Sequence, residues 1–169
     1  LAVAFSRQFH VVGYDSDSTR IAELREGRDR TNEVELPTEG TEQNVITFSD
    51  TPESLKGTDF YCVCVPTPID EDKNPDLDPL ENACRTVASV LRRGDVVVFE
   101  STVYPGATEE ISIPLLEKHS GLKLNDDFSV GYSPERINPG DSKRKLETIV
   151  KVISATSPAT LQLLDDVYG

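Results

Sequence analysis

Four segments of the chain contain hydroxyl, carboxylate or guanidinium groups at the end of a run of apolar residues or directly after it. Groups of these types bind nucleotides and sugars and transfer protons. The segments span residues 11–15, 65–68, 100–106 and 132–140. In an open α/β sheet, ligands bind outside the carboxyl ends of the strands, so a ligand site is expected at these four places.

The first segment ends on Asp15. An acidic residue that closes the second strand of a dinucleotide-binding fold accepts hydrogen bonds from the adenosine ribose and repels the 2′-phosphate of NADP. Arg20, a little further along, could stack over the adenine or contact a phosphate. The alternative is structural: Asp15 would only turn the chain toward a helix capped by Asp17 or Ser18, with Arg20 exposed on that helix.

The position of Asp15 also indicates what precedes the chain. A glycine-rich, phosphate-binding turn is expected about 20 residues before such an Asp. Counting back from Asp15 passes residue 1, and the chain has no Met and opens on an apolar stretch, residues 1–5. We therefore expect the sequence to begin inside a longer protein, after the first strand and the Gly-rich turn.

The second segment places a hydroxyl between two prolines, in the sequence Val65-Pro66-Thr67-Pro68. Proline fixes the backbone, so the Thr67 hydroxyl and the neighbouring carbonyls would be held in place. This arrangement suits a ribose. Its alternative is a simple strand terminator.

The third segment places adjacent hydroxyls at a strand end, in Ser101-Thr102-Val103, followed by Pro105 and Gly106. If a helix starts there, its N-terminus could hold a phosphate or a carbonyl group. A capped helix start without a ligand explains the same residues.

The fourth segment contains a carboxylate and a guanidinium side by side, Glu135 and Arg136, in a loop bracketed by prolines. Glu135 could orient a water molecule or act as a general acid or base, and Arg136 could bind an anionic substrate. A surface ion pair is the alternative interpretation.

No metal site is predicted. Cys62 and Cys64 share a strand face, but no His or third Cys lies close in the sequence, and buried cysteines are common in strands. His10 precedes a predicted strand and His119 lies near a predicted helix end, so both are interpreted as structural.

The elements that would position these residues alternate between short apolar runs and helical patterns. Continuous β-branched runs are typical of strands buried on both faces, hence of parallel sheets. The predicted strands lie around residues 11–12, 60–65, 96–99, 128–130 and 149–153, and the predicted helices at 18–26, 78–91, 106–119 and 157–168. Loops are predicted over residues 28–44 and 136–145. The order predicts an α/β fold with a doubly wound, mainly parallel sheet of the Rossmann type.

The helix over residues 78–91 has the clearest signals. Asp78 is expected to cap it, Pro79 to occupy its first position and Glu81 to complete a capping box. Gly94 is expected to end it in the left-handed conformation. Its apolar residues form one stripe: Leu80, Ala83, Cys84, Val87, Ala88 and Leu91.

Composition restricts the class of protein. The chain has 169 residues, a net charge of −13 and 37% hydrophobic residues, which describes one globular domain over residues 1–169. The negative charge disfavours nucleic-acid binding. No apolar run reaches the roughly 18 residues of a membrane span, and no leader is visible, so a cytoplasmic location with reduced thiols is expected.

Taken together, the four segments resemble the N-terminal NAD-binding domain of the UDP-glucose/GDP-mannose dehydrogenase family. The resemblance rests on the order and spacing of the quoted motifs and covers nearly the whole chain. The phrases at residues 100–106 and 132–140 look most like the branch of UDP-N-acetylhexosamine 6-dehydrogenases. Glucose-specific members have a second Glu where this chain has Pro139, which disfavours UDP-glucose as the substrate.

The resemblance implies roles for individual residues. Asp15 and Arg20 would bind the adenosine half of NAD, whereas Thr67 and Thr102 would contact its nicotinamide half. The implied cofactor-binding set is completed by Val65, Pro66, Pro68, Ser101 and Val103. Glu135 would serve the hydrolytic step, and the nucleotide sugar would be contacted by Glu135, Arg136, Ile137 and Asn138.

The resemblance also implies an activity. The family oxidises a sugar C6 alcohol to a carboxylate in two hydride transfers to NAD, through a thiohemiacetal on a catalytic Cys. That Cys, with its Lys, Asn and Asp companions, would lie beyond this chain, as would the helix through which members form homodimers. Two alternatives stay open: a non-catalytic NAD-sensing module, and an S-adenosylmethionine-dependent methyltransferase, which also places an acidic residue at a strand end.

Overall fold

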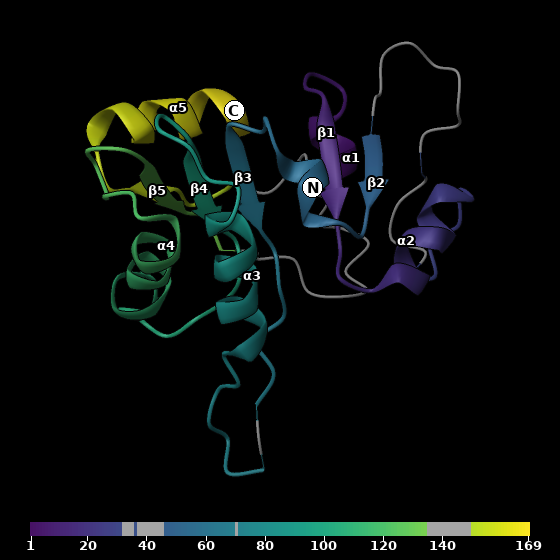
Figure 1. Cartoon of the computed structure of the whole chain (residues 1–169), viewed down its shortest axis with the longest axis horizontal. Helices are drawn as coiled ribbons and strands as arrows, with labels where there is room; N and C mark the ends of the chain where they lie inside the picture. Colours follow the sequence, from purple (N-terminus) through teal and green to yellow (C-terminus); the bar gives the residue numbers. More distant parts are fainter. Residues whose placement is uncertain (32–35, 37–45, 70, 135–149) are drawn as a thin grey trace. The chain divides into compact units, whose positions relative to one another are not determined.

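The computed structural model describes residues 1–31, 36, 46–69, 71–134 and 150–169 (Figure 1). The chain divides into two compact units, residues 1–56 and residues 57–169, and each is described by itself.

The first unit is built around a pair of parallel strands. Its elements are helix α1 (Ala2–Phe5), strand β1 (Val11–Tyr14), helix α2 (Ser18–Arg25), strand β2 (Ile46–Ser49) and the 3₁₀ helix η1 (Pro52–Leu55). β1 and β2 pair with Val11 opposite Ile46. A Cβ on Gly13 would lie 2.9 Å from the Phe48 ring, so a glycine lets that ring cover β1. Strand β2 was not predicted, because it is short and alternates in burial instead of forming a continuous apolar run.

The second unit contains a four-stranded sheet with the order β3-β4-β5-β6. Strands β3 (Phe60–Val63), β4 (Val96–Phe99) and β5 (Ser129–Tyr132) are parallel, whereas β6 (Ser154–Ala155) is antiparallel to β5. All four residues of β4 are buried, as its uninterrupted Val-Val-Val-Phe sequence predicts for a central parallel strand.

Helices cover both faces of this sheet (Figure 1). Helix α3 (Asp78–Ala88) lies beside α4 (Ile113–Ser120), and α4 is preceded by a short π-helix, η2 (Thr108–Ser112). Helix α5 (Pro158–Tyr168) packs on the opposite face, where its Leu164 contacts Val96 and Val98. Because side chains alternate along a strand, Val97 points to the other face, and it too is fully buried.

A glycine sets how closely α5 approaches the sheet. A Cβ built on Gly131 of β5 would lie 2.6 Å from Cδ2 of Leu164, and Leu164 is fully buried. Only glycine therefore fits beneath this leucine. Helix α5 begins as its sequence predicts, with the Ser157 side chain accepting a hydrogen bond from the Thr160 backbone N–H.

Several details of the sequence prediction are wrong. The expected strand over residues 149–153 is replaced by the two-residue β6, and Val150 is 81% exposed. The reason is that the run lies at the sheet edge and directs Lys151 inward, as described below. The helical pattern over residues 157–168 also predicts Leu161 and Leu164 on the buried face, but Leu161 is 41% exposed, because Thr160 and Leu164 form the buried face.

The start and end of α3 also differ from prediction. The helix begins at Asp78 with Leu77 at the N-cap, and no side chain caps it. Glu81 forms no capping box, because it pairs with Arg85 one turn further on. Gly94 has the expected left-handed φ of 92°, but it lies in the turn before β4, well after the helix ends at Ala88. The apolar stripe is confirmed, with Ala83 as its only half-buried member.

The remaining boundaries follow from local chemistry. The predicted helix at 106–119 begins at Thr108 as a π-helix and becomes α-helical at Ile113, because Pro114 has no N–H and fits only a first turn. The predicted loop at 136–145 lies outside the described residues, and of 28–44 only residues 28–31 and 36 are described. Within the described parts of the chain, no helix is long and apolar enough to cross a membrane.

Candidate functional site

In the first unit, Asp15 lies immediately beyond β1. Its backbone N–H donates to the Ser49 carbonyl at 3.1 Å, so it extends the parallel ladder by one residue. The side chain is exposed, and its Oδ1 accepts a hydrogen bond from the Asp17 N–H at 2.9 Å. The turn therefore orients an exposed carboxylate at the carboxyl end of a parallel strand, where a ribose hydroxyl would find an acceptor.

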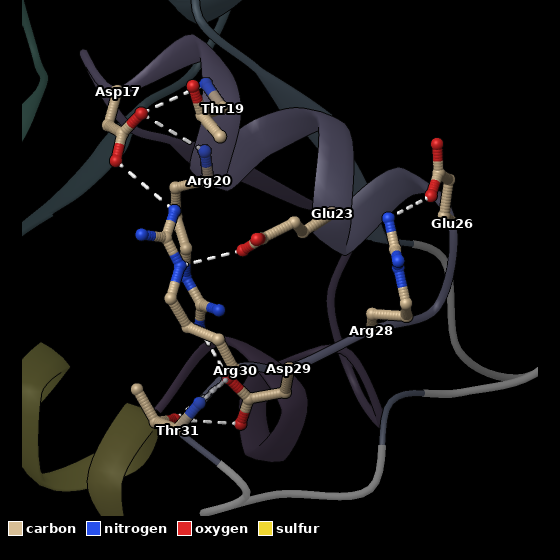
Figure 2. Close-up of polar contacts among 9 residues, drawn as sticks. All are labelled: Asp17, Thr19, Arg20, Glu23, Glu26, Arg28, Asp29, Arg30 and Thr31. Carbon is tan, nitrogen blue, oxygen red and sulfur yellow. Dashed lines mark hydrogen bonds and ion pairs between the residues drawn. The ribbon is translucent and has the colours of Figure 1, made fainter.

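Asp17 caps helix α2, as one of the sequence interpretations proposed. Its Oδ1 accepts from the backbone N–H groups of Thr19 and Arg20, and these bonds lie at the helix start in Figure 2. The hydrogen bond from the Arg20 N–H is the main reason why the pKa of Asp17 is lowered. Arg30 bridges Asp17 Oδ2, at 3.2 Å, and Glu23 Oε2, at 2.6 Å.

Arg20 is held in place and half-buried, which differs from the alternative of an exposed helix residue. Its Nη2 contacts Asp29 Oδ1 at 2.5 Å, and the Asp29 side chain is only 5% exposed (Figure 2). Asp29 also accepts hydrogen bonds from the backbone N–H and the hydroxyl of Thr31. The other terminal nitrogen, Nη1, is buried and has no partner among the described residues. One side of the guanidinium is thus anchored while the other keeps its hydrogen-bonding capacity.

In the second unit, a side-chain hydrogen bond connects the segments that follow β3 and β4. The Ser101 hydroxyl donates to the Val65 carbonyl at 2.7 Å, and Ser101 is 5% exposed. Thr102, the next residue, is exposed. The η2 helix begins only at Thr108 and has no side-chain cap, so the alternative in which these hydroxyls cap a helix start is wrong.

Thr67 lies in the turn that follows β3. Its Oγ1 is buried without a hydrogen-bond partner among the described residues. Pro66 and Pro68 flank it, and the Pro68 carbonyl accepts a hydrogen bond from the Asp76 N–H at 2.8 Å. A buried, unpaired hydroxyl costs about 1–3 kcal/mol, so a ligand that supplies the missing partner would bind favourably here.

The structure therefore brings part of the predicted cofactor set together at the carboxyl ends of strands β3 and β4. Because β3 and β4 are adjacent and parallel, the segments 65–68 and 101–103 both follow the carboxyl ends of neighbouring strands. The four residues predicted around the substrate, Glu135, Arg136, Ile137 and Asn138, lie outside the described residues.

A buried polar cluster at the same edge was not predicted. Glu100, which is 4% exposed, accepts a bond from Lys151 Nζ at 2.6 Å on Oε2, and the Tyr168 hydroxyl donates to its Oε1. Cys62 Sγ lies 3.7 Å from the same hydroxyl. The available signal was a lone Lys within the apolar run 149–153 and a Glu directly after a buried strand. Tertiary contacts alone pair them.

Cys62 and Cys84 have the environment of structural thiols. Burial raises the pKa of Cys62 to about 12 and that of Cys84 to about 11, so both stay protonated and weakly nucleophilic at neutral pH. Cys64 is exposed. Among the described residues, no group of three or more His, Cys, Asp or Glu side chains is arranged to hold a metal ion.

The fold and the strand-end residues are those of a nucleotide-binding α/β domain, and comparison with known proteins identifies its class. Residues 1–169 match the model of the UDP-glucose/GDP-mannose dehydrogenase family, NAD binding domain. The chain belongs to this family, which confirms the predicted family, the Rossmann-type fold and NAD as the cofactor, and decides against a methyltransferase. Four buried side-chain atoms have no hydrogen-bond partner among the described residues, and two of them, Thr67 Oγ1 and Arg20 Nη1, belong to residues of the predicted cofactor set.

Individual relatives are similar over nearly the whole chain. The UDP-N-acetyl-D-glucosamine 6-dehydrogenase of Pseudomonas aeruginosa is 49% identical over 168 residues, which is 99% of this chain and 40% of that protein. Protein CapL of Staphylococcus aureus is 50% identical over 100% of this chain and 39% of its own length. The chain thus spans about 40% of the length of these relatives.

Solved structures agree with the fold. The structure of UDP-D-ManNAc dehydrogenase from Pyrococcus horikoshii matches with a TM-score of 0.89 and 36% identity, over 99% of this chain and 40% of that one. A ternary complex of GDP-mannose dehydrogenase from Pseudomonas aeruginosa matches with a TM-score of 0.84 and 27% identity, again over 99% of this chain and 40% of the other.

Proposed function

We propose that this chain is the NAD-binding part of a nucleotide-sugar dehydrogenase that oxidises the C6 alcohol of a UDP-N-acetylhexosamine to a uronic acid for surface polysaccharide synthesis. The names of the relatives at 48–50% identity support this branch, since two of them are UDP-N-acetyl-D-glucosamine 6-dehydrogenases. The two compact units together form one domain over residues 1–169 in this proposal. The protein is cytoplasmic and forms a homodimer through a region outside this chain.

The observation that supports cofactor binding best is the buried, unpaired Thr67 hydroxyl at the carboxyl edge of the β3–β4 pair. When bound there, NAD accepts the hydride that leaves the substrate carbon. Thr67 and Thr102 supply hydroxyls to the nicotinamide half, and the Ser101–Val65 hydrogen bond fixes the distance between their two strands. The backbones of Pro66, Pro68 and Val103 complete this surface.

Asp15 and Arg20 bind the adenosine half in this proposal. The carboxylate of Asp15 accepts hydrogen bonds from the ribose hydroxyls and repels a 2′-phosphate, so NAD is favoured over NADP. The Arg20 guanidinium, anchored by Asp29, directs its unpaired Nη1 toward the cofactor.

The substrate side belongs to the segment after Pro134. Arg136 binds the anionic diphosphate, Ile137 and Asn138 contact the nucleotide sugar, and Glu135 orients the water that hydrolyses the covalent intermediate. A Cys outside this chain forms that intermediate, because none of Cys62, Cys64 and Cys84 matches the position of the family's catalytic Cys, and burial raises the pKa of Cys62 and Cys84 to about 12 and about 11.

The test starts with calorimetric titration of NAD and NADP into the protein. NAD binding is expected, with much weaker binding of NADP. In the full-length protein that contains this chain, UDP-N-acetylglucosamine is expected to yield two NADH per sugar, and UDP-glucose far less. NAD binding without oxidation of any UDP-sugar would refute the dehydrogenase and favour an NAD-sensing module.

A variant tests the adenosine contact. Asp15→Ala is expected to weaken NAD binding by about tenfold or more, because a hydrogen bond to a charged group contributes about 1.5–3 kcal/mol. The far-ultraviolet circular dichroism spectrum should not change, since the Asp15 side chain is exposed. An unchanged NAD affinity would refute this role for the end of β1.

A further inference from the structure

Lys151 lies between the ends of two neighbouring strands. Its Nζ is 2.6 Å from Glu100 Oε2 and donates to the Ser133 carbonyl at 3.3 Å. Glu100 directly follows β4, and Ser133 directly follows β5. One ammonium group therefore contacts the chain beyond both strands.

The environment of this ion pair is unusual for a pair that only stabilises the fold. The side chains of Lys151 and Glu100 are 9% and 3% exposed. Desolvating two charges offsets most of their attraction, so an apolar pair of similar volume is often as stable or more stable. In contrast, the pair between Lys123 and Glu117 in the same unit lies near the surface, at 3.7 Å, and pays little desolvation.

The hydrogen bonds around the pair are nearly complete, which defines a single geometry. Tyr168, at the end of α5, donates to Glu100 Oε1, so both carboxylate oxygens have a donor. The Lys151 ammonium also lies 5.3 Å from the centre of the Tyr168 ring, within the range of a cation–π contact. These contacts orient Glu100 from one side and Lys151 from the other.

The position of the pair coincides with the end of the backbone ladder. The described hydrogen bonds between β4 and β5 finish with the Ser133 N–H donating to the Phe99 carbonyl at 2.9 Å. Beyond that bond, Lys151 links the segment that follows β4 to the segment that follows β5. Ser101 and Thr102 follow Glu100 directly, and Pro134 and Glu135 follow Ser133.

We propose that Lys151 is a positioning residue that fixes Ser101 and Thr102 relative to Ser133 and Pro134. The proposal rests on the proposed function, in which Thr102 contacts the nicotinamide half of NAD and the residues that follow Pro134 in the sequence serve the nucleotide sugar. Hydride transfer requires these two reactants in one geometry, and a displacement of about 1 Å can lower a rate by about a hundredfold. Loss of Lys151 therefore lowers kcat, while the separate affinities for each ligand change little.

The experiment compares three variants of the full-length protein that contains this chain. Lys151→Met keeps the length of the side chain without its charge, Lys151→Arg keeps the charge, and Lys123→Met removes the surface partner of Glu117 as a control. For Lys151→Met we expect kcat to fall about tenfold or more and KM for NAD to change less than about threefold. Lys151→Arg should recover most of the lost kcat, and Lys123→Met should behave as the wild type.

The outcomes separate positioning from folding. A folded Lys151→Met variant with wild-type kcat would overturn the proposal, as would an effect confined to KM or to thermal stability. An Arg variant as impaired as the Met variant would overturn it too, because it would assign the effect to packing. If Lys151→Met does not fold, Glu100→Gln removes the ion pair while keeping the side-chain shape, and wild-type kcat in that variant would overturn the proposal.

A second readout does not depend on turnover. Amide hydrogen exchange in Lys151→Met, or in Glu100→Gln if the Met variant does not fold, should become faster in peptides covering residues 100–103 and 131–134. Exchange over residues 11–15 of the first unit should not change. If the wild type binds NAD but oxidises no UDP-sugar, the proposed function fails, and this measurement still decides whether Lys151 holds the two segments. If exchange over residues 100–103 and over residues 131–134 were unchanged, the proposed link through Lys151 would be refuted.

Discussion

The substitution Gly131→Ala tests the close approach between helix α5 and the sheet. The added Cβ would lie 2.6 Å from Cδ2 and 3.4 Å from Cδ1 of Leu164, and 3.4 Å from the Ser154 carbonyl oxygen. Leu164 is fully buried against Val96 and Val98, so it cannot rotate into open space. The helix or the leucine must therefore shift.

The expected magnitude follows from two opposing effects. Overpacking a core position by one methyl group costs about 1–3 kcal/mol. Replacing Gly by Ala also restricts the unfolded chain, which stabilises by about 0.4–1 kcal/mol where the backbone geometry permits it. The net loss is about 1–2 kcal/mol, which lowers the melting temperature of a domain of this size by about 2–8 °C.

A double-mutant cycle gives the test its specificity. Leu164→Ala alone should cost about 2–5 kcal/mol by leaving a cavity. In the double variant Gly131→Ala/Leu164→Ala the new methyl occupies part of that cavity, so the combined loss should be smaller than the sum of the single losses. Leu163→Ala, on the exposed face of α5, is the matched control and should add to Gly131→Ala without coupling.

The assay is urea unfolding followed by circular dichroism. A Gly131→Ala variant as stable as the wild type would refute the steric argument. So would a cycle in which Leu164→Ala and Gly131→Ala simply add. A confirmed coupling would show that the close packing of α5 on the sheet requires a residue without a Cβ at position 131. Helix α5 also carries Tyr168, whose hydroxyl donates to Glu100.

Three further predictions concern single side chains. Thr67→Val should weaken NAD binding yet leave the free protein equally or more stable, because the lost hydroxyl is buried without a described partner; a variant that is less stable with unchanged NAD affinity would contradict this. In the native protein, iodoacetamide should modify the exposed Cys64 before Cys62 and Cys84, whose pKa values burial raises to about 12 and about 11, and mass spectrometry of timed samples would reveal the reverse order if this is wrong. Burial raises the pKa of Asp95 above its usual 3.8, so its contribution to stability is full below about pH 3.8 and is lost as the pH rises through the folded-state pKa. Urea unfolding should therefore show the wild type gaining stability relative to Asp95→Asn as the pH falls from about 7 to about 4, and a constant difference would contradict the assignment.

The sequence predicted the elements whose pattern is local. Strand β4 is a continuous apolar run, and α3 has an apolar stripe at helical spacing, so their types could be assigned without tertiary information. The strand-end motifs containing Asp15 and Thr102 were recognisable for the same reason, because each is contiguous in the chain. Family, fold class and cofactor followed from these contiguous patterns.

The element boundaries were less well predicted, because neighbouring polar residues can each accept a hydrogen bond from the backbone at the start of a helix. Asp78 was a suitable cap by residue type, yet Asp76 Oδ1 accepts the Asp78 N–H and the helix begins at Asp78 itself. The run at 149–153 had the composition of a buried strand, but at the sheet edge Val150 is exposed and Lys151 turns inward. Local propensity cannot decide which of two possible local arrangements the rest of the fold favours.

What only the tertiary structure decided are contacts between residues far apart in the chain. No spacing rule relates Glu100 to Lys151 and Tyr168, or Gly131 to Leu164, because the separation is set by how helices and strands stack. The anchoring of Arg20 by Asp29 and the unpaired Thr67 hydroxyl are of the same kind, since burial is a property of the packed molecule. The sequence by itself determined which chemical groups stand at the strand ends, and packing determined which of them are paired, oriented and withdrawn from water.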